Sequence, residues 1–233
     1  MSLLRSLPVR DEEQACFDEC WQRIAGPGAW WSGAERLAMV REARRAPDCR
    51  LCKARLEALS PNAVGGEHDH EGVLPDAAVE VVHRMRTDSG RLTRTWFEDV
   101  ISAGLTPVRY VEMVGVVAAA VVMDTFSLAT GRGLRSLPDP LGGEPTQDPS
   151  DPVVDDGAFV PIMKVPDPGP VAAGSLPPIP NIARSLALVP AARELFFAAF
   201  RPHYALRDMA LDITRPQTEL VAARVSATNQ CFY

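Results

Sequence analysis

The sequence predicts an all-α fold, and three observations support this prediction. Amphipathic stretches with apolar residues every three to four positions recur along most of the chain. Helix start and stop signals, such as a Ser, Thr or Asp cap, a first-turn proline or a closing glycine, separate these stretches. Alternating runs of β-branched residues, which are typical of strands, are nearly absent. The 233 residues suffice for one large domain or two small ones.

The first half of the chain is divided into helices by these signals. The expected helical ranges are 11–24, 33–46, 49–59, 75–86, 92–103 and 108–130. Ser32 with Glu35 three residues later forms a capping box. Asp48 is expected to cap the third helix, with Leu56 and Leu59 as its apolar anchors. Thr106, followed by a proline, is expected to start the longest helix.

A proline-rich segment separates this half from the rest. Twelve of the 21 prolines fall between Leu137 and Pro180, a density that excludes a regular helix or a central strand. We therefore expect an N-terminal helical unit over 1–136, an extended connector over 137–180 and a second unit over 181–233. In the second unit the helical ranges are 182–188, 191–200 and 217–228.

Charge and composition limit the partners and the location. The net charge of −6 and the pI near 5.3 argue against nucleic acid as a main partner. The most apolar run, 114–123, is bracketed by Glu112 and Asp124, so it is too short for a bilayer and indicates a core helix. The N-terminus lacks a signal-peptide pattern, which predicts a cytoplasmic protein whose thiols stay reduced.

Cys49 and Cys52 form the one complete Cys-x-x-Cys motif of the sequence. Such a pair serves either dithiol redox chemistry or metal ligation. In the redox case, a thiolate at a helix N-terminus is stabilised by the helix dipole and by free backbone N–H groups. The expected cap at Asp48 places the pair at such a position, and Arg50 adds positive charge.

Metal ligation needs two further ligands beside the cysteine pair. His68 and His70 are one candidate pair, and Cys16 and Cys20 are another. Both pairs depart from the usual spacing of zinc sites. We expect the two histidines to lie on a solvated loop and the two upstream cysteines to be buried in a helix.

The C-terminal stretch resembles a known family. Glu219 is followed by eleven residues and Cys231 in an apolar helical segment, and Asn181 begins a stretch similar to the entry helix of the same family. This arrangement resembles the signature helix of the alkylhydroperoxidase D and carboxymuconolactone decarboxylase family. In the peroxidase branch, that helix continues with two residues, a second Cys, three residues and a His. Those two positions would fall beyond Tyr233.

The N-terminal unit resembles a diverged copy of the same family. The region from 33 through the Cys-x-x-Cys is similar to the signature helix, but Glu35 lies fourteen residues before Cys49 rather than twelve. Leu56 also stands where the family has its His. A proton relay would then have to use His83 or Glu42 instead.

This resemblance implies two helical units in tandem, the second truncated, and a thiol-dependent peroxidase or disulfide reductase. It implies catalytic roles for Cys49, Cys52, Glu219 and Cys231, and weaker ones for His83 and Glu35. It further implies a peroxide or disulfide substrate, a thiol reductant protein as partner, a homo-oligomer and no cofactor.

Two other interpretations remain open. One is a non-catalytic or zinc-binding helical module with Cys49, Cys52, His68 and His70 as ligands. The other is a cofactor-free lyase of the carboxymuconolactone decarboxylase type. A further hypothesis concerns the chain end: the reading frame continues past Tyr233, hidden by an artefact or by a UGA codon read as stop.

Overall fold

The structure is a computed structural model, and it describes residues 6–148, 150–165, 179–202 and 211–228. The all-α prediction is confirmed, because strands within these ranges are limited to one two-stranded antiparallel ladder. The α-helices are α1 (Asp11–Ala25), α2 (Gly33–Arg45), α3 (Arg50–Glu57), α4 (Asp76–Asp88), α5 (Arg94–Ser102), α6 (Pro107–Ala129), α7 (Asn181–Leu186), α8 (Pro190–Phe200) and α9 (Arg215–Thr228). The short elements are the 3-10 helices η1 (Ala46–Asp48), η2 (Pro61–Ala63) and η3 (Ser89–Arg91) and the strands β1 (Val153–Val154) and β2 (Ile162–Met163).

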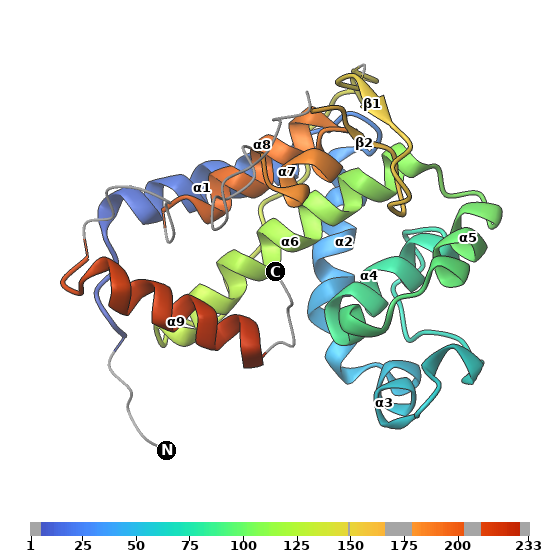
Figure 1. Cartoon of the computed structure of the whole chain (residues 1–233), viewed down its shortest axis with the longest axis horizontal. Helices are drawn as coiled ribbons and strands as arrows, with labels where there is room; N and C mark the ends of the chain where they lie inside the picture. The colour runs from blue at the N-terminus through green and yellow to red at the C-terminus, as the bar shows by residue number, and fades with distance from the viewer. Residues whose placement is uncertain (1–5, 149, 166–178, 203–210, 229–233) are drawn as a thin grey trace, which may run out of the picture.

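Helix α6 forms the centre of the fold (Figure 1). Helices α1 and α8 lie along one side of it, α2 crosses it, and α3, α4 and α5 gather at the other side (Figure 1). By length and composition alone α6 would also pass for a membrane span, but half of its most apolar window is buried inside the protein. Gly115 allows α8 to pack closely against α6, since a Cβ at this position would lie 2.7 Å from the Cβ of Ala192 on α8. The run 114–123 therefore lies in the core helix that the sequence predicts.

The predicted capping signals fix the starts of α2 and α6. The Ser32 Oγ accepts a hydrogen bond from the Glu35 N–H at 3.3 Å, and the Glu35 carboxylate accepts the Ser32 N–H at 2.9 Å. Thr106 likewise accepts the Arg109 N–H at 3.4 Å ahead of the proline that begins α6. The capping box and the cap-plus-proline predictions are thus confirmed.

Helix α3 begins one residue later than predicted. Asp48 belongs to η1, the tight turn that contains Pro47, and Cys49 is the N-cap with an extended backbone (φ −61°, ψ 131°). The expectation that Asp48 caps this helix is therefore wrong, because Asp48 is the last residue of the 3-10 turn Ala46–Asp48 that contains Pro47. As a result, Cys49 lies at the helix end itself and Cys52 lies in the first turn.

The predicted anchors of α3 are also corrected. Its last helical residue is Glu57, so Leu59 lies beyond the helix and is fully exposed, and Leu56 is 57% exposed. The helix is instead held through its first turn, which forms a small cluster of its own. The members of that cluster are Cys49, Leu51, Cys52 and the half-buried Val64. Burial of Cys49, Leu51 and Cys52, rather than of Leu56 and Leu59, thus helps to fix α3 to the protein.

The proline-rich segment lies over the end of α1 and the residues that follow it. The Leu141 N–H donates to the Ala25 carbonyl at 2.8 Å, and the Thr146 N–H donates to the Gly28 carbonyl at 3.0 Å. Beyond β1 and β2, α7 and α8 contribute to the same apolar core as α1 and α6. The helices on both sides of the segment thus share one core.

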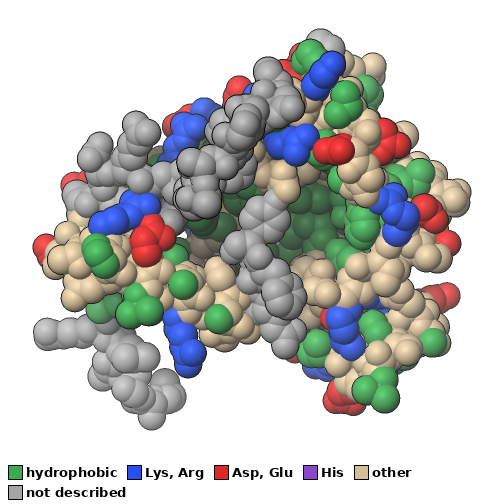
Figure 2. Space-filling view, in the orientation of Figure 1, with side chains coloured by type: hydrophobic (Ala, Val, Ile, Leu, Met, Phe, Trp, Pro, Cys, Tyr) green, Lys and Arg blue, Asp and Glu red, His purple; other side chains and the backbone are tan. Residues whose placement is uncertain are grey.

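Helix α9 carries an exposed apolar stripe. Leu220, Val221 and Val225 are 70%, 57% and 55% exposed, and Thr218 is the one buried residue of this helix. These apolar side chains appear as green atoms over α9 at the lower left of the space-filling view (Figure 2). The helical pattern predicted for 217–228 is therefore present, while the stripe that it forms lies on the surface.

Candidate metal centre

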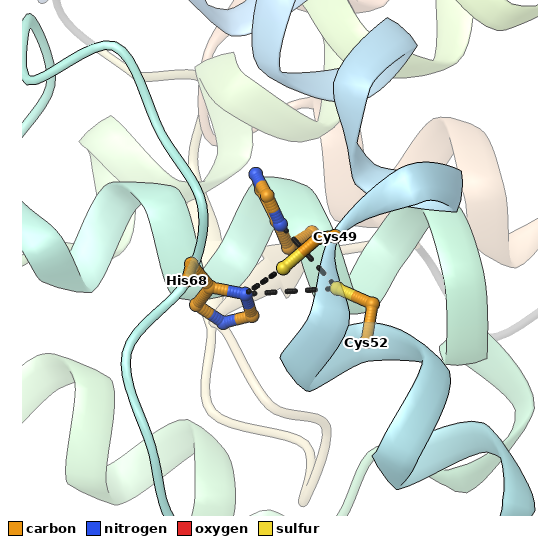
Figure 3. Close-up of side chains that lie close together, drawn as sticks. Cys49, Cys52 and His68 are labelled. Atoms are coloured by element: carbon orange, nitrogen blue, oxygen red, sulfur yellow. Dashed lines mark hydrogen bonds between the residues drawn. The ribbon is translucent and has the colours of Figure 1, made fainter.

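Four potential metal ligands converge where the start of α3 meets α4. Cys49 and Cys52 come from the first turn of α3, His68 from the loop between η2 and α4, and His83 from the middle of α4. One ligand atom from each residue lies within 4.8 Å of the other three. The two sulfurs and the His68 ring point toward one another (Figure 3).

Three sulfur-to-nitrogen separations in this cluster fit the edges of a tetrahedral site. The Nδ1 of His68 lies 3.4 Å from the Cys49 sulfur and 3.6 Å from the Cys52 sulfur. The Nδ1 of His83 lies 3.3 Å from the Cys52 sulfur. With zinc–sulfur bonds of about 2.3 Å and zinc–nitrogen bonds of about 2.0–2.1 Å, a tetrahedron has sulfur-to-nitrogen edges of about 3.5 Å.

Each histidine turns its other nitrogen toward a carboxylate. The Nε2 of His68 lies 2.8 Å from an oxygen of Glu80, and the Nε2 of His83 lies 3.0 Å from an oxygen of Glu42. A carboxylate at that position holds the proton on Nε2 and leaves the Nδ1 lone pair free. Metal-binding histidines in proteins are commonly oriented in this way.

Further contacts hold both carboxylates in place. Glu80 also receives hydrogen bonds from Arg55 at 2.7 Å and from the Trp96 indole at 2.8 Å. Glu42, which is 2% exposed, accepts the Glu71 backbone N–H at 2.8 Å. The orientation of both imidazole rings is therefore determined by α2, α3, α4 and α5 together.

The loop that carries His68 is fastened on both sides of that residue. Asp69 forms an ion pair with Arg50 at 2.8 Å, and its backbone N–H lies 3.4 Å from the Cys49 sulfur. Glu71 contacts Arg41 and Arg45 of α2 at 2.7 and 3.0 Å. These contacts place His68 over the first turn of α3.

The site is buried, and its charges depend on one another. Burial opposes ionisation of Cys49, but the backbone amides of Cys52 and Asp69 and the imidazole of His68 outweigh it and lower the pKa of this thiol. Burial also lowers the pKa of His83, which favours its neutral form. For His68, burial lowers the pKa, but hydrogen bonds to Cys52, Glu80 and Cys49 outweigh it and raise the pKa to about 10. Without an ion this imidazole therefore carries a proton on Nδ1 as well, and a cation that binds there displaces that proton. The Cys49 thiol is therefore predisposed to the thiolate form that metals bind.

The structure corrects the predicted position of one histidine. His68 is not on a solvated loop, since its side chain is 7% exposed and contacts both cysteines. His70 is exposed, and its ring accepts the Gly72 N–H. The predicted set Cys49, Cys52, His68 and His70 does not converge in its last member, because the exposed His70 ring turns to the backbone of its own loop at Gly72. His83 takes that place.

The histidine on α4 offered a signal in the sequence. His83 lies four residues after Val79, so it shares the inward, buried face of this helix. A histidine on such a face needs a polar partner, and the buried Glu42 supplies it. His83 thus lies beside the Cys52 sulfur, and Glu42 lies behind His83.

The remaining predicted residues lie elsewhere. Glu35 caps α2 through Ser32 and does not approach the cysteines. Glu219 lies on α9 and forms an ion pair with Arg215. Cys16 and Cys20 lie along α1, where the Cys16 thiol donates to the Ala198 carbonyl at 3.0 Å. The predicted catalytic residue Cys231 lies outside the described residues.

A cavity of about 550 Å³ adjoins the cluster on the His68 side. Its walls come from α3, α4, α5 and the loop before α4. His68 and Glu80 form part of this wall, whereas the two cysteines do not line it. Small molecules that enter the cavity thus meet the imidazole before the sulfurs.

Comparison with known proteins finds no matching family model, no similar curated protein and no similar solved structure. The chemistry of the site therefore has to be inferred from its own residues. Two thiols, two imidazoles and two carboxylates can bind a soft or borderline divalent cation. The same groups, without a cation, can support dithiol oxidation.

Proposed function

We propose that the protein is a zinc-binding helical protein in which Cys49, Cys52, His68 and His83 hold one ion. The observation that carries this proposal is the convergence of four ligand atoms within 4.8 Å, with a carboxylate behind each histidine. Glu42 and Glu80 then act as positioning residues for the ligands. The interpretation as a zinc-binding module thus gains support, with His83 as the fourth ligand.

The donor set favours zinc over other common ions. Two thiolates and two imidazoles suit a borderline-soft cation with tetrahedral geometry, whereas magnesium and calcium prefer oxygen ligands. A doubly charged cation also balances two thiolates in a place where Cys49 and Cys52 are 1% and 3% exposed. Four protein ligands leave no coordination position for a substrate, which is typical of structural zinc.

The ion would add a direct connection among three parts of the chain that already meet through Arg55, Asp69 and Glu71. Helix α3 has eight residues and exposed leucines at its end, and the loop from 58 to 75 contains only η2. Binding through α3, this loop and α4 would fix them to one another. The zinc site therefore contributes to folding, because the binding free energy of a structural metal is folding free energy.

Metal analysis of the purified full-length protein tests this proposal. We expect about one zinc per chain, and less than a tenth of that in Cys49→Ser or His83→Ala. His70→Ala is the matched control, since this exposed histidine lies two residues from a ligand, and we expect it to retain the ion. Metal-free protein after purification with zinc, with the cysteine pair reactive toward a thiol reagent, would refute the proposal.

A dithiol oxidoreductase is a second candidate function, and the chain of contacts behind Cys52 favours it. The Cys52 sulfur lies 3.3 Å from His83, which lies 3.0 Å from Glu42, so a proton can move away from this thiol. Burial raises the pKa of Cys49, but hydrogen bonds lower it further than burial raises it. The resulting lowered pKa suits a nucleophilic thiolate. The cysteines among the described residues are free thiols, which fits a reducing cytoplasm.

In that candidate, a hydroperoxide or a small disulfide is the substrate, a thiol protein is the reductant, and the chain assembles with copies of itself. Peroxidase assays on metal-free protein with a thiol reductant separate the two candidates. Activity that is lost in both Cys49→Ser and Cys52→Ser, and kept in a Cys16→Ser and Cys20→Ser control, supports the dithiol function. Equal activity in Cys49→Ser, in Cys52→Ser and in the control would exclude the dithiol function.

A further inference from the structure

The two cysteines of the site are placed to bond to each other. Cys49 is the N-cap of α3 and Cys52 lies three residues later, so both side chains lie on one face of the first turn. Both sulfurs approach the same atom, Nδ1 of His68, at 3.4 and 3.6 Å. A disulfide requires a sulfur-to-sulfur bond of about 2.05 Å, which side-chain rotation in a Cys-x-x-Cys turn can provide.

Oxidation would change the two cysteine ligands and leave the two histidine ligands unchanged. A disulfide between Cys49 and Cys52 removes both thiolates, which are half of the ligands and all of the negative ligand charge. The remaining His68 and His83 are neutral ligands, and two imidazoles alone hold zinc weakly compared with a four-ligand site. Oxidation and zinc binding are therefore mutually exclusive at this pair.

We propose that the site is a redox-controlled zinc switch, in which a hydroperoxide converts Cys49 and Cys52 to a disulfide and the zinc ion is released. This inference rests on the proposed zinc site. The oxidant is a small hydroperoxide, because the buried sulfurs do not line the adjoining cavity and a large oxidant would not reach them. A dithiol reductant reverses the reaction and restores binding.

The chemistry needs no other reactant. The Cys49 thiolate attacks the terminal oxygen of the hydroperoxide, the O–O bond breaks, and the alkoxide takes a proton to leave as an alcohol, or as water from hydrogen peroxide. Cys49 is then a sulfenic acid. The Cys52 thiolate attacks this sulfur, the S–O bond breaks, and hydroxide leaves and is protonated to water. The two sulfurs lose two electrons, and the hydroperoxide gains them.

The loop and the first turn of α3 would separate after release. Glu80 still holds His68, and Asp69 still pairs with Arg50 at an exposed position. At an exposed position this ion pair adds little to the stability of the contact. Helix α3 has its own cluster of only a few buried residues, so local opening is the expected structural response.

Cys16 and Cys20 provide an internal comparison. They lie four residues apart in the middle of α1, where helical hydrogen bonds fix the backbone on both sides. Burial raises the pKa of the Cys20 thiol to about 12, so it stays protonated and unreactive. Peroxide should therefore modify the pair in α3 before the pair in α1.

The test uses the zinc-loaded full-length protein with Cys16, Cys20 and Cys231 replaced by serine, so that Cys49 and Cys52 are its cysteines. Its zinc content is first measured. Hydrogen peroxide is then added in the presence of a chromogenic zinc indicator, and peptides are analysed by mass spectrometry. We expect release of about one zinc per chain, loss of two hydrogens from the peptide that joins Cys49 and Cys52, and recovery after a dithiol and zinc are added.

Each outcome has a distinct meaning. Zinc that stays bound while the pair stays reduced under excess peroxide would overturn the switch and leave the zinc site intact. Release with sulfinic or sulfonic acids and no disulfide would also overturn it. A protein that contains no zinc before peroxide refutes the proposed zinc site instead. Circular dichroism confirms that the serine variant is folded, and His70→Ala in the same background should behave as its parent.

Discussion

Replacement of Glu42 by glutamine should weaken zinc binding while the ligands themselves stay unchanged. One oxygen of Glu42 faces the His83 Nε2 at 3.0 Å, and the other accepts the Glu71 N–H at 2.8 Å. Both are acceptor roles. Glutamine keeps the size of the side chain but turns one of the two acceptors into an NH₂ donor.

Either orientation of the new amide is unfavourable. If the NH₂ faces His83, the imidazole must present an unprotonated Nε2, and the proton then moves to Nδ1, the atom that faces Cys52. If the NH₂ faces the Glu71 N–H, two donors meet in a buried place. Loss of a carboxylate behind a histidine ligand typically reduces metal affinity about 10–100-fold, which corresponds to about 1.4–2.7 kcal/mol.

A competition titration against a chromophoric chelator measures this difference directly. Glu35→Gln is the matched control, because Glu35 lies on the same helix and caps Ser32 instead of contacting a histidine. We expect the control to bind zinc as tightly as the parent protein. An affinity of Glu42→Gln within twofold of the parent would refute the role of the carboxylate and, with it, the tautomer argument.

Three further predictions concern stability. Removal of zinc by a chelator should lower the free energy of urea unfolding by about 4 kcal/mol, relative to protein at a free zinc concentration of about a thousand times Kd. It should also speed amide exchange across 58–75. An unchanged urea midpoint would contradict a structural ion. Gly115→Ala should cost about 1–3 kcal/mol because the new methyl meets the Cβ of Ala192 at 2.7 Å, whereas Gly90→Ala, with nothing within 4 Å, should leave the urea midpoint nearly unchanged. Burial raises the pKa of Tyr110 to about 12, so its contribution is complete below about pH 10 and is lost as pH rises toward 12, by about 2–3 kcal/mol at most; Tyr110→Phe should flatten the alkaline fall in thermal stability.

Local signals in the sequence predict the helices well because capping and proline act over a few residues. Ser32 and Thr106 cap α2 and α6 as predicted, since each bond closes within three residues. The anchoring of α3 was predicted wrongly because apolar spacing cannot tell a buried leucine from an exposed one. Leu56 and Leu59 have the right spacing, but both side chains stay exposed at the end of this short helix.

The sequence likewise predicts the part of the site that depends on neighbouring residues and misses the part that depends on distant ones. Cys49 and Cys52 are adjacent through their spacing alone, so the sequence suffices to pair them. His83 is 31 residues from Cys52 along the chain and meets it only because α4 packs against the start of α3. The choice of His83 over His70 therefore depends on the tertiary packing of α4 against α3. Residue spacing along the sequence does not contain this information.

Glu80 gives the protein a built-in optical probe. One carboxylate joins His68 at 2.8 Å and the Trp96 indole at 2.8 Å. An ion that binds His68 withdraws electron density from the ring, strengthens its bond to Glu80 and thereby alters the hydrogen bond that the indole donates. The emission of Trp96 is thus chemically connected to the proposed metal centre. In a variant that keeps Trp96 as its one tryptophan, the state of that centre can be followed in solution by fluorescence without an added dye.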